Sequence, residues 1–162
     1  MFQINDTVVH HRDGIAVITG IIEMNGDQYF TIKASRVDDV LIYVPVLTAT
    51  DIIRNVMCLE EATKLLEQMK DIPEIYISNT KQRRDDFKRR LASIDINDLA
   101  FLTKMYLLHR TNTFVTENVK LGVMDVDMLK DAYNRLSDEF AVVFNILAEN
   151  IEQYLIEKLG MQ

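Results

Sequence analysis

The chain has 162 residues, of which 48% are hydrophobic and 27% are charged, and its formal net charge is −7. This length accommodates one or two small domains, and the composition is typical of a globular protein. The acidic balance excludes a protein that coats nucleic acid over its whole surface, so any contact with a polyanion must be local. No apolar run approaches the roughly 18 residues that a membrane span needs, and the N-terminus lacks the pattern of a signal peptide.

Cys58 is the only cysteine of the chain. A single cysteine cannot form a disulfide within the chain, which is typical of a reducing compartment, so we expect a cytoplasmic protein. The sequence shows no ligand set at metal-binding spacing, no glycine-rich phosphate loop and no nucleophile motif. We therefore expect no catalytic residues, no metal and no cofactor.

Residues 1–50 have the pattern of short β-strands. Residues 15–23 are rich in β-branched side chains, Asn25 and Gly26 follow, and residues 28–33 then alternate in polarity. An Asn-Gly pair between two such runs is the strongest short signal for a β-hairpin, because both residues tolerate positive φ. Together with a further β-rich run at residues 40–44, this pattern predicts a small barrel-like antiparallel sheet. The edge of such a sheet can pair with a strand of a partner.

The hydrophobic period changes from 2 to about 3.6 residues near Thr50. We therefore predict an α+β protein, with a β-rich domain at residues 1–50 and an all-α helical domain at residues 51–162. The residues between Asp51 and Val56 are expected to form a short helical turn at the start of the second domain.

Four helices are predicted, and the first begins at Leu59 and ends at the Asp-Ile-Pro-Glu segment of residues 71–74, where Pro73 blocks its continuation. Residues 80–93 form a basic helix, and residues 96–109 form a helix that is apolar nearly all round and therefore buried among others. A last, long helix is predicted to begin at Asp125 or Asp127 and to run to about Leu159, where Gly160 ends it.

The basic helix is an island of positive charge. Residues 81–90 hold six of the 18 Lys and Arg residues and two Asp, so this window carries +4 and the rest of the chain −11. The helix has an apolar stripe of Phe87, Leu91 and Ile94 and a basic stripe of Lys81, Arg84 and Lys88. It can therefore pack its apolar side on a core and leave its basic side exposed.

Two explanations of this charge stay open. One is a polyanionic partner, since phosphate contacts supply most of non-specific nucleic-acid binding. The other is a solvated helix with internal ion pairs, because Asp85 and Arg89, and likewise Asp86 and Arg90, stand four residues apart.

Several motifs follow one another in a definite order. They are Ile-Asn-Asp-Thr-Val-Val at residues 4–9, Asp-Gly-Ile-Ala-Val-Ile at residues 13–18, Val44-Pro45, and Leu-Ala-Ser-Ile-Asp at residues 91–95 before an apolar helix. With the order of β module, helical hairpin, basic helix and helical bundle, they resemble the CarD/CdnL family of bacterial transcription regulators. The resemblance covers about residues 2–110.

This resemblance implies a function. The N-terminal module, which is Tudor-like and shared with the transcription-repair coupling factor, would bind the lobe of the RNA polymerase β subunit. The helical domain would contact promoter DNA, and the protein would be a regulator without enzymatic activity.

We assign the polymerase contact to the β-rich run, which comprises Val40, Leu41, Ile42, Tyr43 and Val44. We assign the DNA contact to five cations of the basic helix, which are Lys81, Arg83, Arg84, Lys88 and Arg89.

The chain also departs from the family pattern. Two positions that often carry polymerase-contacting arginines align with Met24 and Tyr43. The tryptophan wedge of the family would fall near Thr80 or Lys81, and this chain has no Trp. An apolar wedge unstacks a base step, which Thr and Lys cannot do, so we expect only weak phosphate contacts. The alternative is a protein–protein interaction module of the same architecture without a functional DNA contact.

Overall fold

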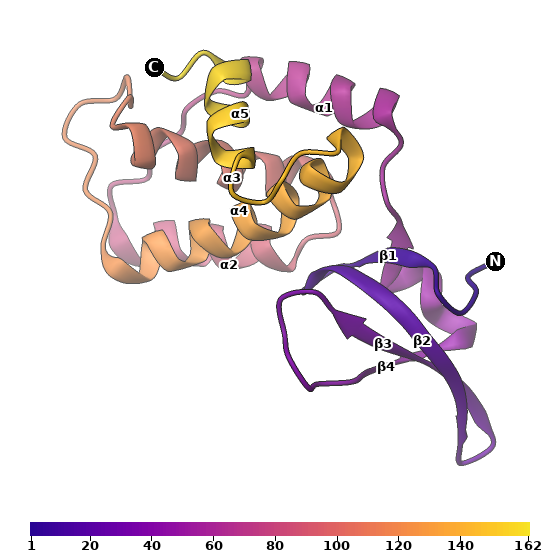
Figure 1. The fold of residues 1–162 in the computed structure, drawn as a ribbon. Helices are drawn as coiled ribbons and strands as arrows, with labels where there is room; N and C mark the ends of the chain where they lie inside the picture. The colour runs from indigo at the N-terminus through magenta and orange to yellow at the C-terminus, as the bar shows by residue number, and fades with distance from the viewer. The chain divides into compact units, whose positions relative to one another are not determined.

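The computed structural model describes all 162 residues, which divide into two compact units, Met1–Met57 and Cys58–Gln162. The first unit is a β-sheet and the second consists of helices (Figure 1). The predicted α+β class is therefore confirmed. None of the helices combines the length and the apolar character that crossing a membrane requires.

The first unit is an antiparallel sheet of five strands in the order β4-β3-β2-β1-β5. Its elements are β1 (Thr7–His10), β2 (Gly14–Met24), β3 (Asp27–Ala34), β4 (Ile42–Pro45), the 3-10 helix η1 (Val46–Asp51) and β5 (Ile53–Asn55). The predicted hairpin between β2 and β3 is present, and its turn residues Asn25 and Gly26 have φ values of 54° and 86°. One side of the sheet covers the core of this unit, which includes Val8, Ile18, Phe30, Ile32 and Val44.

The prediction of a helical turn at residues 51–56 is wrong, because Ile53–Asn55 form the strand β5. Ile53 pairs with His10 of β1, so these residues add a fifth strand to the sheet. The side chain of Ile53 is 2% exposed and belongs to the same core as Val8 and Ile18. A strand of three residues gives almost no periodic signal, and only its contacts with β1 decide its structure.

The second unit contains five helices, which are α1 (Leu59–Asp71), α2 (Thr80–Ala92), α3 (Ile96–Thr111), α4 (Val123–Phe144) and α5 (Ile151–Leu159). Helix α3 contacts α1, α2 and α4, and most of its side chains are buried, as the sequence predicted. The rings of Tyr106 in α3 and Tyr133 in α4 lie 4.7 Å apart between their centroids. The core of this unit is therefore built around α3.

The prediction of one long C-terminal helix is wrong, because the chain turns between α4 and α5. Asn145 adopts the left-handed conformation with φ 53° and ψ 50°, and Ile146 N donates a 2.9 Å hydrogen bond to Ala141 O. This is the geometry that ends many helices, and Asn tolerates it better than most residues. The ring of Phe144 then lies 5.5 Å from that of Tyr154, so the last turn of α4 packs against α5.

Candidate functional site

Strand β4 is an edge of the sheet and pairs only with β3. Of the residues assigned to the partner contact, Val40 and Leu41 precede the strand and are each 50% exposed. Tyr43 is 48% exposed, whereas the side chain of Val44 is buried in the core. The side chain of Val44 is therefore not available to a partner, whereas the side chains of Val40, Leu41 and Tyr43 are.

Helix α2 begins at an Asn cap and docks through one aromatic side chain. The Oδ1 atom of Asn79 accepts a 3.0 Å hydrogen bond from Gln82 N. Phe87 is 2% exposed and fixes the helix to its own unit. Of the five cations assigned to DNA, Lys81, Lys88 and Arg89 are exposed, Arg84 is half-buried and Arg83 is buried.

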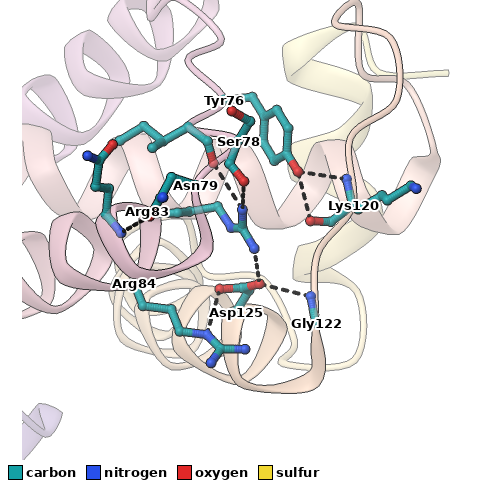
Figure 2. A network of polar contacts seen from close by, with 10 residues as sticks. Tyr76, Ser78, Asn79, Arg83, Arg84, Lys120, Gly122 and Asp125 are labelled. Carbon is teal, nitrogen blue, oxygen red and sulfur yellow. Dashed lines mark hydrogen bonds and ion pairs between the residues drawn. The ribbon is translucent and has the colours of Figure 1, made fainter.

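Arg83 lies inside the helical unit and holds Asp125 of α4. Its Nη2 atom is 2.8 Å from Oδ2 of Asp125, and its Nη1 atom donates to the carbonyl oxygens of Ile77 at 2.9 Å and Ser78 at 3.2 Å. The same Oδ2 atom accepts a 2.8 Å hydrogen bond from Gly122 N (Figure 2). Arg83 therefore joins the segment before α2, α2 itself and the first turn of α4.

Asp125 is ionised in this setting. Burial alone would raise its pKa, but the hydrogen bonds from Arg83 and Gly122 and the nearby charges of Arg83 and Arg84 hold the pKa below its ordinary value. The Nε atom of Arg84 lies 3.5 Å from Oδ1 of the same carboxylate. Two guanidinium groups thus share one carboxylate, and the side chain of Arg84 remains 32% exposed.

The exposed side of α2 carries ion pairs within the helix. Lys81 contacts Asp85 at 3.0 Å, and Arg89 contacts Asp86 at 2.9 Å. The predicted pairing of Asp85 with Arg89 is therefore replaced by these two pairs. Lys88 is exposed and forms no ion pair. Surface pairs of this kind are weak and screened by salt, so a phosphate can compete for the cations.

Arg90 has a structural role that the sequence only partly indicated. It forms the predicted contact with Asp86 at 2.9 Å and a second one with Asp98 at 2.9 Å. Its guanidinium carbon also lies 4.0 Å from the ring centroid of Phe101. These contacts fix the end of α2 to α3.

The segment between α1 and α2 is fastened to the loop before α4. The carboxylate of Glu74 accepts hydrogen bonds from Val115 N at 2.9 Å and Thr116 N at 2.7 Å. The hydroxyl of Tyr76 donates to Lys120 O at 3.0 Å and accepts from Lys120 N at 3.1 Å (Figure 2). Together with the contacts of Arg83, these bonds hold the start of α2 in place.

Comparison with known families concerns the first unit. Residues 2–57 match the CarD-like/TRCF RID domain. These residues form a domain of that family. The resemblance derived from the sequence is thereby confirmed for the RID domain, whose match ends where the first compact unit ends. No curated protein matches the chain.

The RID domain contains one exposed apolar surface that the assignment of the polymerase contact to residues 40–44 left out, although Met24 aligns with a polymerase-contacting position of the family. Ile22 and Met24 of β2 are each 37% exposed, although both are apolar. Alternation along the strand could have placed them on one face, because residues two apart in a strand point the same way. The helical unit lies outside the matched residues, so the family match assigns no role to α2.

Proposed function

We propose that this chain is a non-enzymatic transcription regulator that binds the RNA polymerase β subunit through its RID domain and contacts promoter DNA through α2. The observation that carries the proposal is the match of residues 2–57 to the RID family, the RNA polymerase-interacting domain. The matched residues include the whole sheet, from β1 to β5. The family match therefore covers the complete sheet, including its two edge strands β4 and β5.

The polymerase contact is proposed at the β4 edge. An edge strand presents unpaired main-chain groups, to which a strand of a partner can add by hydrogen bonding. Tyr43 stands on this edge and Leu41 directly before it, and both side chains are about half exposed. They can pack against the added strand, which gives specificity beyond the main-chain contacts.

The test is binding of the full chain to purified RNA polymerase. Lys side chains on an edge strand oppose the addition of another strand, so we expect Leu41→Lys with Tyr43→Lys to weaken binding about tenfold or more. The matched control is Asn55→Lys in β5 at the opposite edge, where we expect no change. Equal loss in both variants would contradict the assignment of β4.

The DNA contact is proposed for the exposed cations of α2, namely Lys81, Lys88 and Arg89, with Arg84 beside them. Phosphate contacts of this kind are sequence-tolerant, and each one lost should lower the log–log salt slope by about one unit. We expect the triple variant Lys81→Glu, Lys88→Glu, Arg89→Glu to give a shorter lifetime of the open complex with polymerase than the unaltered chain. The control variant places Glu at three exposed lysines of α1 and α5, which are Lys64, Lys70 and Lys158.

A second candidate function is a protein–protein interaction module without a functional DNA contact. It is favoured by the burial of Arg83 and by the ion pairs of Lys81 and Arg89, which reduce the free positive charge of α2. An unchanged open-complex lifetime in the α2 variant, with polymerase binding intact, would select this alternative.

A further inference from the structure

The sheet of the RID domain has a face that points away from its core. Tyr29 of β3 stands opposite Ile22 of β2 and Pro45 of β4, whereas the next residue, Phe30, stands opposite Ile21 and Val44. Phe30 and Val44 are buried in the core. Because successive side chains in a strand point to opposite faces, the row of Tyr29 lies on the other side of the sheet.

This side of the sheet is apolar. Tyr43 is 48% exposed, and Ile22 and Met24 are each 37% exposed. On β2, β3 and β4, charged side chains occur on this side only at its two ends, at Asp27 and Lys33. We name it the outer apolar face, and it consists of Ile22, Met24, Tyr29, Tyr43 and Pro45.

The polar side chains beside this face already form hydrogen bonds within the sheet. The hydroxyl of Thr19 donates to Thr31 O at 3.1 Å and lies 2.9 Å from the Thr31 hydroxyl. Thr31 is only 7% exposed, and a methyl group at Gly20 would stand 3.1 Å from its Oγ1 atom. Apart from the hydroxyl groups of Tyr29 and Tyr43, the centre of the face therefore offers a partner hardly any polar group with which to hydrogen-bond.

The outer apolar face is continuous with the β4 edge, because Tyr43 belongs to both. A strand that adds to β4 would lie about 4.8 Å from it and would place every second side chain on this face, beside Tyr43. We propose that the polymerase strand that adds to β4 carries aliphatic or aromatic side chains, and that this partner covers the outer apolar face. This inference rests on the proposed function and specifies the chemistry of the partner.

Docking of this kind depends on apolar burial and main-chain hydrogen bonds. Salt screens contacts between exposed charges, but it does not weaken apolar contacts. The affinity for polymerase should therefore change little with ionic strength. The DNA contact of α2 should behave in the opposite way, since it depends on phosphates.

Ile21 and Ile22 provide a matched pair for the test. They are neighbours in β2, are 46% and 37% exposed, and point to opposite sides of the sheet. We would measure the affinity of the full chain for purified RNA polymerase core, with far-UV circular dichroism and thermal unfolding as controls of folding. We expect Ile22→Glu to weaken binding about tenfold and Ile21→Glu to change it less than about twofold. Met24→Glu is the second variant in case Ile22→Glu does not fold.

The salt series is run on the unaltered chain, from about 50 mM to about 500 mM, and we expect less than about a threefold change in affinity. Equal losses for Ile21→Glu and Ile22→Glu, or a steep fall of affinity with salt, would overturn this inference while leaving polymerase binding in place. A chain that does not bind polymerase at all would overturn the proposed function as well. If Ile22→Glu alters only self-association in sedimentation, the face is covered by a second copy, and the inference is wrong.

Discussion

Arg83 and Asp125 form an ion pair although 42 positions separate them in the chain. The Nη2 and Oδ2 atoms are 2.8 Å apart, and the two side chains are 5% and 0% exposed. The most buried charge contact of α2 thus points into the helical unit. The helix therefore presents less positive charge to a partner than its sequence suggests.

Removing one member of this ion pair should lower the stability of the folded chain. We expect Arg83→Met to lower the free energy of unfolding by about 3–5 kcal/mol, because it leaves the carboxylate of Asp125 buried with less compensation. Urea denaturation of the full chain measures this loss. The control is Lys88→Met on the exposed side of the same helix, which should change the stability by less than about 0.5 kcal/mol. Similar values for the two variants would refute the structural role of Arg83.

The same pair should make stability depend on acid pH. The pKa of Asp125 in the folded chain lies below its ordinary value of 3.8, so the ionised carboxylate stabilises the folded state at neutral pH. As the pH falls below 3.8 and then through the lowered folded pKa, this contribution is lost. We expect the stability difference between the unaltered chain and Asp125→Asn to be constant near neutral pH and to shrink in acid. A difference that stays the same across the acid range would count against an ionised Asp125.

Strand β5 should be required for the RID domain to fold. We expect residues 1–57 to unfold cooperatively on heating, because they contain the whole core of the first unit. Residues 1–50 lack Ile53, which is 2% exposed, and leave β1 without a neighbour on one side. This shorter chain should show no cooperative transition by circular dichroism. Identical melting curves for the two chains would show that β5 is dispensable.

The turn between α4 and α5 should depend on the left-handed conformation of Asn145. Replacing Asn145 by Ala should destabilise the full chain by about 1 kcal/mol, because Ala lacks the short polar side chain that lets Asn tolerate positive φ. Replacement by Gly should cost less than Ala, since Gly adopts this conformation freely. Thermal unfolding of the two variants is the measurement, and an Ala variant as stable as the Gly variant would argue against this reading of the turn.

The sequence predicted the features that depend on local patterns. The Asn25-Gly26 hairpin and the buried helix α3 both follow from the residue types in a short window. The strand β5 and the inward direction of Arg83 depend instead on partners far away in the chain, namely β1 and Asp125. One local signal did exist, because Arg83 stands four residues before Phe87 and therefore lies on the docking side of the helix.

The end of α4 was missed for a related reason. Residues on both sides of Asn145 continue the apolar pattern of a helix, and only Asn145 itself marks the turn. An Asn inside a helical pattern is a weak signal, because it also occurs within helices. The exposed face of the sheet, by contrast, could have been found from alternation once the register of β2 and β3 was fixed.

We infer that the RID domain is the part of this chain that binds RNA polymerase. The most direct test of this claim compares the affinity of purified RNA polymerase core for the full chain, for residues 1–57 and for residues 58–162. We expect residues 1–57 to bind within about threefold of the full chain and residues 58–162 to bind much more weakly. Binding by residues 58–162 and by the full chain, but not by a folded 1–57 domain, would contradict the claim.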